Sequence, residues 1–511
     1  MADRRQFLKA SAALVIWLTR NQPAAAGEWP ANLTTVRTDI ASNPQRPRYH
    51  FLPPANWMND PNGPIFCNGY YHLFYQYNPD GAYWGNMHWG HARSRDLVHW
   101  THLPMALAPT PGGPDKGGCF SGSAFDHDGT PTLVYTGVEP EVQCLASSDN
   151  AMVRWRKFKG NPVIGGPPHG YAATGFRDPS IWREGADWLM TVGSGVKGRG
   201  GAVLLYQSND LLPWNYIHEL ASGPPFSATT GVDGDAKYDP VAAGDMWECP
   251  DFFPLGAGHT LLVSTQGAVH WMTGSYEGRA LNPHHQGKVD YGDFYYAAKS
   301  FAAPHGRRIL WGWLKEGRSA PEQRAAGWAG VMSLPRVLSM GEDQTLQIEP
   351  APELQVLREP LHRLKNLEVR GYVPLPRVRG GCLEIDAEIV CGSAEEFGLI
   401  VRQSPDSEEE TIIALNPSRG QLTLDTRRSS LDPGTVRGVY RGPLEIQPGI
   451  PVQLSIFLDR SVIEVFANRR ACLTARIYPT RSDSLGARLF AKDGKITVKK
   501  LSTHTMRSIW G

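Results

Sequence analysis

The sequence has few of the uninterrupted Ala, Leu, Glu and Lys runs that are typical of long helices. It also has no excess of charge, because 51 Lys and Arg against 50 Asp and Glu leave a net charge of +1. Without a basic field, we expect neither nucleic acid nor an anionic membrane as a partner. The seven cysteines form no Cys-x-x-Cys pair and no cluster with histidine, so we assign no disulfide framework, metal site or cofactor.

Glycine, proline and aromatic residues are abundant instead, with 54 Gly, 41 Pro, 16 Trp, 18 Tyr and 17 Phe. Turn formers and aromatics together favour an all-β protein of many short strands. Trp and Tyr also suit sugar binding, because an aromatic face packs against the apolar C–H face of a sugar ring. At 511 residues the chain is too long for one core and is expected to form two or more domains.

Residues 1–26 have the pattern of an export signal. Arg4 and Arg5 precede a short apolar run, Ala10–Leu18, and small residues at 24–26 provide a cleavage site. The apolar run is too short to span a membrane, and the paired arginines resemble a bacterial twin-arginine signal. The sequence therefore predicts export to the periplasm or the medium.

An internal repeat runs through the first two thirds of the chain. Five segments share a strand, a polar or glycine turn and a strongly apolar second strand. The paired segments are 61–66 with 71–75, 122–125 with 132–135, 179–182 with 188–192, 250–253 with 260–263, and 294–297 with 308–313. Repeats roughly 50–70 residues apart, each with about four strands, are typical of propeller blades.

The domain organisation follows from this repeat. We predict a five-bladed β-propeller over 47–345, a linker over 346–362 and a β-sandwich over 363–511. The last region alternates polar and apolar residues, as a sandwich requires. Asp459 and Glu464 in this region are expected to have packing and surface roles.

Acidic residues occupy equivalent positions in the repeats. The position before the first strand holds, in copy order, Asp60, Phe120-Ser121, Asp178, Glu248 and Asp293. An isolated Asp among Asn, Pro and Gly, such as Asp60, is by default a turn residue. Equivalent positions in a propeller meet at one end of its axis, however, so Asp60, Asp178 and Glu248 should converge. Three convergent acids without a set of metal-binding histidines indicate acid/base and nucleophilic carboxylate chemistry.

The motifs around these acids resemble those of glycoside hydrolase family 32, which contains invertases, inulinases, levanases and fructan exohydrolases. The resemblance covers the whole mature chain in order. The motifs are Trp57-Met58-Asn59-Asp60-Pro61-Asn62-Gly63, Trp84-Gly85-Asn86, Phe120-Ser121-Gly122-Ser123, Arg177-Asp178-Pro179, Glu248-Cys249-Pro250, Asp293-Phe294-Tyr295 and Asp459-Arg460-Ser461-Val462-Ile463-Glu464.

This resemblance implies a retaining, exo-acting hydrolase that releases terminal β-D-fructofuranosyl units from sucrose, inulin or levan by double displacement. Asp60 would be the nucleophile, Glu248 the acid/base and Asp178 the stabiliser of the transition state. The two carboxyl groups of a retaining pair stand about 5–5.5 Å apart. Further residues are implied in fructose binding: Trp57, Asn59, Gln76, Trp84, Phe120, Ser121, Arg177 and Asp293. Cys249 is interpreted as a small packed neighbour of Glu248.

Two sequence patterns suggest other chemistry and are given structural interpretations. Gly193-Ser194-Gly195-Val196-Lys197-Gly198 matches a dinucleotide-binding pattern, but a second strand follows instead of a helix, so a hairpin is predicted. The histidines at 88 and 91, 99 and 102, and 284 and 285 lack a carboxylate partner in sequence and are interpreted as structural or sugar-contacting residues.

Other functions remain as alternatives. They are a fructosyltransferase of the same family, an arabinofuranosidase like those of family 43, and a propeller that binds carbohydrate without catalysis. The three acids with their flanking motifs disfavour the last alternative. Sucrose-preferring plant members carry an Asp and a Lys after the Glu-Cys motif, whereas 264–270 has neither. This leaves sucrose against fructan open, with a slight preference for added fructan hydrolysis, and the oligomeric state is also open.

Overall fold

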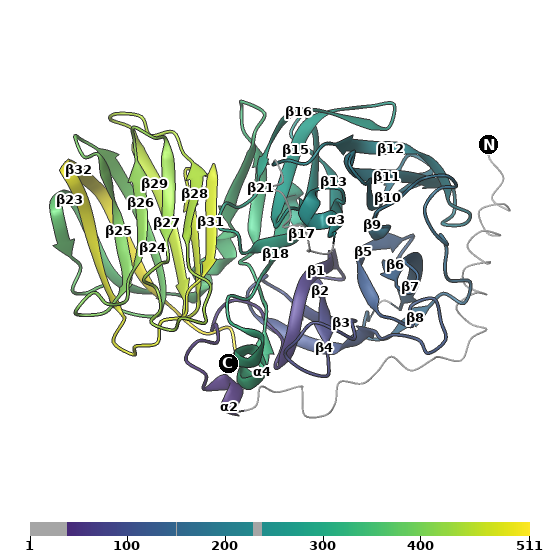
Figure 1. The fold of residues 1–511 in the computed structure, drawn as a ribbon, viewed down its shortest axis with the longest axis horizontal. Helices are drawn as coiled ribbons and strands as arrows, with labels where there is room; N and C mark the ends of the chain where they lie inside the picture. The colour runs from purple at the N-terminus through teal and green to yellow at the C-terminus, as the bar shows by residue number, and fades with distance from the viewer. Residues whose placement is uncertain (1–37, 150, 228–237, 511) are drawn as a thin grey trace.

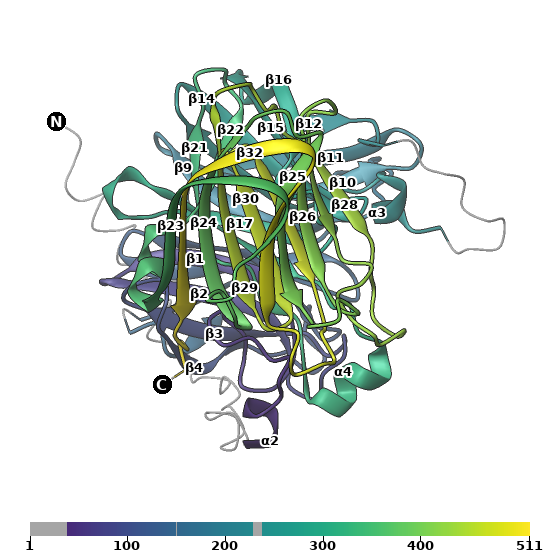
Figure 2. The same ribbon diagram turned by 90° about the vertical axis from the view of Figure 1, so that its left-hand side faces the viewer.

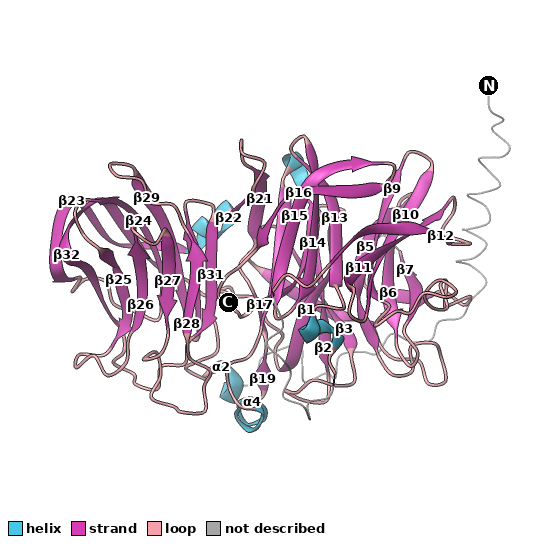
Figure 3. Ribbon diagram, turned by 45° about the horizontal axis from the view of Figure 1, so that its top comes forward, coloured by secondary structure: helices cyan, strands magenta, loops and turns pink. Residues whose placement is uncertain are grey.

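A computed structural model describes residues 38–149, 151–227 and 238–510. The export signal predicted over 1–26 lies outside these residues. The chain forms two lobes of strands placed side by side, a propeller and a sandwich (Figure 1). Helices are short (Figure 3), namely α2 (Thr38–Ala41), α3 (Pro240–Ala243), α4 (Ala320–Ala326), η1 (Pro304–Gly306) and η2 (Pro352–Leu357). In the described ranges no helix is long and apolar enough to cross a membrane.

The first lobe is a five-bladed β-propeller, as predicted. Blade one holds β1 (Asn56–Cys67), β2 (Tyr70–Asn78), β3 (His88–Ser94) and β4 (Trp100–Leu107). Blade two holds β5 (Cys119–His127), β6 (Thr130–Gly137), β7 (Val142–Ser148) and β8 (Trp155–Lys157). Blade three holds β9 (Arg177–Glu184), β10 (Asp187–Val196), β11 (Gly200–Ser208) and β12 (Asn215–Gly223). Blade four holds β13 (Glu248–Leu255), β14 (Gly258–Thr265), β15 (Ala268–Glu277) and β16 (Ala280–Lys288). Blade five holds β17 (Tyr295–Ala302), β18 (Arg308–Leu314), β20 (Val331–Met332), β21 (Arg336–Met340) and β22 (Leu346–Pro350).

Each predicted hairpin is the pair of innermost strands of a blade. Tight turns with positive φ at both central residues join some of these strands, at Asn68-Gly69 and Asp128-Gly129. Such turns match the twist of the flanking strands and favour Asn, Asp and Gly. The pattern over 193–198 is also a hairpin, because β10 and β11 pair antiparallel up to Val196 and Gly200.

A short strand closes the propeller. β19 (Trp328–Ala329) leaves blade five and pairs in parallel with the start of β1, with Asn56 opposite Trp328 and Trp57 opposite Ala329. The first and last blades are therefore joined by hydrogen bonds next to Asn59 and Asp60, which lie within β1 at its register shift against β2 and not in a turn. This closure fixes the position of that part of β1 relative to the rest of the ring.

The second lobe is the predicted β-sandwich. Its strands are β23 (Arg358–Pro374), β24 (Cys382–Cys391), β25 (Glu396–Gln403), β26 (Thr411–Asn416), β27 (Gln421–Asp425), β28 (Val439–Pro443), β29 (Pro451–Asp459), β30 (Val462–Ala467), β31 (Ala471–Arg476) and β32 (Gly486–Met506). The long strand β32 pairs with β25 over 486–492 and with β24 over 496–505. It therefore passes from one layer to the other together with β23, which curves beside it (Figure 2).

The boundary between the lobes differs from the prediction. Residues 346–350 form β22, which pairs with β21 and completes blade five. Sandwich strand β23 already begins at Arg358, so only η2 lies between the lobes. The acidic, proline-containing composition of the segment suggested a linker, but the ladder to β21 needs this strand as its partner.

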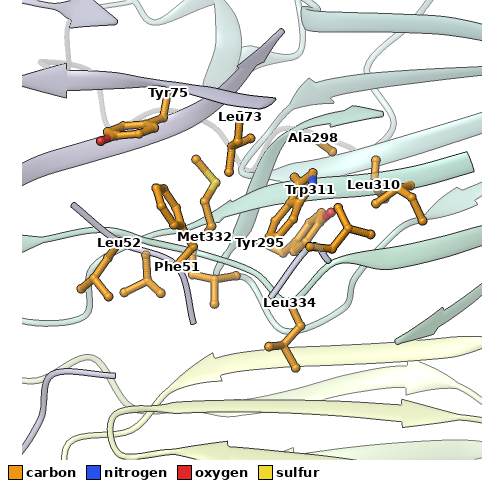
Figure 4. Packing of buried hydrophobic residues seen from close by; sticks show 14 of the residues in the cluster. Phe51, Leu52, Leu73, Tyr75, Tyr295, Ala298, Leu310, Trp311, Met332 and Leu334 are labelled. Carbon is orange, nitrogen blue, oxygen red and sulfur yellow. The ribbon is translucent and has the colours of Figure 1, made fainter. Parts of the chain in front are cut away.

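Apolar packing and buried charges hold the lobes together. Leu334 lies between blade five and the sandwich, at the edge of the cluster of Trp311, Tyr295 and Met332 (Figure 4). Beside it, His50 contacts Asp459 through Nδ1 at 2.9 Å and Glu464 through Nε2 at 3.1 Å; all three side chains are fully buried.

Arg336 of β21 extends this network. It pairs with Asp290 at 2.9 Å and with Glu464 at 2.6 Å, again with buried side chains. The expectation that Asp459 and Glu464 serve surface roles is therefore wrong. Sequence alternation shows that one face of a strand is covered, but it does not show that the cover is another domain.

Candidate functional site

The three predicted acids lie on the innermost strands of three blades, Asp60 on β1, Asp178 on β9 and Glu248 on β13. Cys249 connects them. Its N–H donates to Asp178 Oδ2 at 2.9 Å, and its Sγ lies 3.5 Å from that oxygen and 3.6 Å from Asp60 Oδ2. The structure therefore brings the acids of blades one, three and four to one end of the propeller axis.

Backbone irregularities present these side chains. In every blade the register of the innermost strand against its neighbour shifts near this end. The shifts lie between Met58 and Pro61, Phe120 and Gly122, Arg177 and Ser180, Glu248 and Asp251, and Tyr296 and Lys299. Asp178 and Cys249 have φ values of 65° and 50°, in the left-handed region. Bulges of this kind re-aim side chains and are common beside active sites.

Asp60 is held by hydrogen-bond donors on both of its oxygens. Ser121 Oγ donates to Oδ2 at 2.6 Å, and Asn59 Nδ2 donates to Oδ1 at 2.9 Å. Asn59 is itself fixed, because Trp57 Nε1 donates to its Oδ1 at 2.7 Å. These two donors, together with the Cys249 thiol near Oδ2, hold the carboxylate of Asp60 in one orientation. The predicted residues Trp57, Asn59 and Ser121 thus act through Asp60.

Glu248 also has separate partners for its two oxygens. Arg177 donates to Oε1 from Nε at 3.0 Å and from the terminal nitrogen NH2 at 2.8 Å, whereas Tyr296 OH donates to Oε2 at 2.7 Å. The remaining terminal nitrogen of Arg177, NH1, donates to Glu141 Oε1 at 2.9 Å. Burial by itself lowers the pKa of Arg177, but the charges of Glu248 and Glu141 outweigh it and raise that pKa.

Asp178 is the most deeply buried of the three acids, with 3% of its surface exposed. Burial is the main cause that raises its pKa to about 7; Arg177 opposes the shift, and the charges of Glu248 and Asp60 add to it. A buried carboxyl beside two others cannot ionise freely, because like charges at short range repel. Its backbone N–H donates to Thr136 Oγ1 at 2.9 Å.

The aromatic residues predicted to bind sugar differ in exposure, because Trp84 is exposed, Phe120 is half-buried and Trp57 is buried. Trp84 is 60% exposed, and its ring meets that of Phe120 edge-on at a centroid distance of 6.1 Å. Trp57 meets Trp313 at 5.8 Å. Gln76 is buried and donates to Cys119 O at 3.0 Å, which places it behind the second-blade strand.

Asp293 is exposed, with φ of 60°, and in the described part of the chain no contact ties it to Asp60, Asp178 or Glu248. The irregularity at the start of β17 instead directs Tyr296 to the acid cluster.

No histidine pair singled out in the sequence forms a metal site with carboxylates among the described residues. The expectation that these histidines lack a carboxylate partner is wrong for His99, whose Nδ1 lies 2.7 Å from Asp96 Oδ2. His91 Nε2 contacts His72 Nδ1 at 3.0 Å, and burial and His72 lower the pKa of His91. One group of potential ligands within those ranges does lie close together, Glu384, Asp386 and His504 of the sandwich. Arg358 pairs with both of these acids, so its guanidinium already supplies the positive charge there.

Comparisons with known proteins agree with this geometry. The profile of the glycosyl hydrolases family 32 N-terminal domain matches residues 50–350, and that of the family 32 C-terminal domain matches 353–505. The chain belongs to glycosyl hydrolase family 32. It is 35% identical over 491 residues to a sucrose-6-phosphate hydrolase of Zymomonas mobilis, with 89% of this chain and 91% of the relative covered.

Other members of family 32 show the same likeness. A levanase of Bacillus subtilis is 34% identical over 516 residues, covering 91% of this chain and 71% of the levanase. Among solved structures, fructan 1-exohydrolase IIa of Cichorium intybus superposes with a TM-score of 0.82 at 28% identity, covering 91% of this chain and 98% of that one. This chain is therefore a β-fructofuranosidase-like glycoside hydrolase in fold and class.

Three site residues of this family 32 chain were missed in the sequence. Tyr296 directly follows the Asp293-Phe294-Tyr295 motif, so the motif ends one residue before the side chain that contacts Glu248. Trp313 lies in the second strand of the fifth repeat, where its apolar neighbours suggested core packing. Glu141 lies in the turn between β6 and β7 and belongs to no repeat or motif, so the sequence gives no signal for it.

Proposed function

We propose that this protein releases terminal β-D-fructofuranosyl units from sucrose and from fructans of the inulin or levan type. The observation that supports it most is the different setting of two carboxyl groups in one cluster. Asp60 accepts hydrogen bonds on both oxygens, as a fixed nucleophile requires, and Glu248 is oriented by Arg177 and Tyr296.

In the first step the Asp60 carboxylate attacks C2 of the fructosyl unit. The bond from C2 to the leaving oxygen breaks, and that oxygen takes the proton of Glu248. The products are a fructosyl ester on Asp60, the released glucose or shortened fructan, and ionised Glu248. Asp178 holds fructose hydroxyls and stabilises the positive charge that develops at C2.

In the second step Glu248 takes a proton from water as the water oxygen bonds to C2. The ester bond to Asp60 breaks, so fructose leaves with its original anomeric configuration and both carboxyl groups return to their first state. Arg177 stays bound to Glu248 Oε1 and Tyr296 stays bound to Oε2. These contacts hold the carboxyl group of Glu248 in one orientation for both proton transfers.

Transfer of fructose to another sugar differs from hydrolysis only in the second step, where a sugar hydroxyl replaces water. The names of the relatives favour hydrolysis. Arabinofuranoside cleavage of the family 43 type has less support, because both family 32 profiles match this chain.

The preference between sucrose and fructan depends on the residues that would contact the sugar beyond the first fructose. Residues 264–270 form the end of β14, a turn at 266–267 and the start of β15, and they lack the Asp and Lys of sucrose-preferring plant members. Lys315 reaches this turn and donates from Nζ to Gly267 O at 3.0 Å. Exposed Trp84 offers a stacking face for the sugar beyond the first fructose. These features are compatible with a short disaccharide and with the end of a longer chain.

A sugar-release assay tests the proposal. Wild type, Asp60→Asn and Glu248→Gln are incubated with sucrose, inulin, levan and an aryl arabinofuranoside, and the products are separated. We expect fructose from at least one of the first three substrates with wild type and a loss of at least about a thousandfold in each variant. Cleavage of the arabinofuranoside alone would overturn the proposal.

We further propose that residues 1–26 export the folded enzyme. Arg4 and Arg5 with the apolar run after them support this proposal. Replacing both arginines by lysine keeps the charge but removes the paired-arginine motif. We expect the protein to move from the periplasm or medium to the cytoplasmic fraction; unchanged export of the variant would contradict this route.

A further inference from the structure

Glu141 is an acid at the mouth of the site that no motif includes. It lies in the turn just before β7 of blade two, and 27% of its side chain is exposed. Its Oε2 accepts the backbone N–H of Phe176 at 2.6 Å, and its Oε1 accepts Arg177 at 2.9 Å. Glu141 is therefore fixed to the two residues that precede Asp178.

The guanidinium of Arg177 joins two glutamates from different blades. One edge of it binds Glu248 Oε1, and its third nitrogen binds Glu141. The Arg177 side chain is only 16% exposed, so water screens these contacts little. One cation thus divides its charge between an acid that transfers protons and an acid that does not.

We propose that Glu141 is a positioning residue that orients Arg177 and keeps Glu248 able to hold a proton. The proposal rests on the function proposed for Glu248. An arginine that binds a single carboxylate strongly favours the ionised form of that carboxylate. A second carboxylate on the same arginine weakens this effect and adds a negative charge near Glu248, and both changes favour the protonated form that the first step needs.

The other charged and titratable groups around Glu248 come from three further elements, and none of them is changed by substitution at position 141. They are Asp60 on β1, Asp178 on β9 and Tyr296 on β17; Cys249 on the same strand as Glu248, with Lys299 near it, completes the set.

The test uses Glu141→Gln, which keeps the shape and one of the two acceptor oxygens but removes the charge. Glu141→Asp restores the charge. Glu139→Gln is the matched control, because Glu139 is an exposed acid in the same turn. The profile of kcat/KM against pH is measured on the best substrate for each protein.

We expect the alkaline limb to move to lower pH by roughly half a unit to one unit in Glu141→Gln, since Glu248 then loses its proton earlier. Glu141→Asp should return at least half of the shift, and Glu139→Gln should leave the limb unchanged. A merely structural role would lower activity equally at every pH. An unmoved limb in Glu141→Gln would overturn the proposal.

A second measurement separates this proposal from the proposed function. Proton uptake is titrated without substrate, and each curve is compared with that of the same protein carrying Glu248→Gln. The Glu248 proton should be released at lower pH in Glu141→Gln than in wild type. If wild type releases no fructose, the proposed function fails, and the titration still decides whether Glu141 acts on Glu248; equal release in both proteins contradicts it.

Discussion

The hydroxyl of Tyr296 donates a hydrogen bond of 2.7 Å to Glu248 Oε2, the oxygen that Arg177 does not contact. Burial, and then the charge of Glu248, raise the pKa of Tyr296 well above its usual value, so the hydroxyl keeps its proton across the working pH range. Tyr296 is therefore a constant donor, and it favours the ionised form of Glu248.

Tyr296→Phe removes this donor without removing the ring. We expect the alkaline limb of kcat/KM to move to higher pH, by up to about one unit, because ionised Glu248 loses a charge-assisted hydrogen bond. The direction is opposite to that expected for Glu141→Gln. A pH profile of the purified variant checks it, and a shift to lower pH would contradict the role given to Tyr296.

Asp178 makes stability depend on pH. An unfolded Asp ionises near 3.8, whereas the pKa of Asp178 in the folded protein is raised to about 7 by burial and by neighbouring carboxylates. Between these values the folded state holds the extra proton, so this group lowers stability as pH rises from about 4 to 7. Asp178→Asn is neutral at every pH and can still accept the N–H of Cys249.

We therefore expect Asp178→Asn to be inactive but more stable than wild type at pH 8, by on the order of 4 kcal/mol, with the difference vanishing near pH 4. Thermal unfolding midpoints across this range measure it. A variant that is less stable by the same amount at all pH values would show that the carboxyl carries no such cost.

The buried contact between the lobes depends on pH in two directions. Burial lowers the pKa of His50, but hydrogen bonds to Asp459 and Glu464 outweigh it and raise the pKa above 6.5. His50 thus stabilises the fold fully below pH 6.5, and this gain is lost as pH rises through its folded pKa. Burial raises the pKa of Asp459 and of Glu464, but the contacts of these carboxyls, including those with His50, outweigh it and lower both pKa values. The stability that these two ionised carboxylates contribute is therefore lost as pH falls below about 4.5.

Stability from this network should accordingly be greatest between about pH 4.5 and 6.5. His50→Gln should lower the free energy of unfolding at pH 5.5 by about 3 kcal/mol, because it leaves the buried carboxylate of Asp459 without its cation, whereas Glu464 keeps Arg336. The exposed His99–Asp96 pair is the control, since His99→Gln should cost less than about 1 kcal/mol. Equal losses in the two variants would contradict the role of His50.

Gly330 keeps space for the strand that carries Asp60. It has φ of +79°, and a Cβ there would lie 1.9 Å from Met58 O. Gly330→Ala should destabilise the protein by at least about 2 kcal/mol and reduce activity, because β1 must move. Gly306 has a similar φ of +72° with nothing within 4 Å, so Gly306→Ala measures the backbone cost alone. If both variants unfold at the same temperature, the contact with Met58 is unimportant.

The repeats made the propeller and its three acids predictable, because hairpin turns and apolar strands recur at a regular spacing around Asp60, Asp178 and Glu248. The bulges that aim these acids leave no pattern in the sequence. The role of Glu141 could not be predicted either, since a single acid in a turn has the pattern of any solvated residue, and only the structure shows its contact with Arg177.

The sandwich shows the same limit. Its alternation predicted strands, but the fully buried positions of Asp459 and Glu464 depend on the docking of His50 and Arg336 from the other lobe. The composition of 346–350 predicts a linker for a similar reason, because the strand can be recognised only from its pairing with β21.

A covalent fructosyl group on Asp60 is the most direct test of the proposed mechanism. Glu248→Gln is mixed with β-D-fructofuranosyl fluoride, whose fluoride leaves without a proton donor, and is then denatured and digested for mass spectrometry. Since this variant lacks the base for the second step, one fructosyl group should accumulate on the peptide that contains Asp60 and be absent when Asp60→Asn is added. Fluoride release with no adduct at any time, or an adduct on another residue, would contradict Asp60 as the nucleophile.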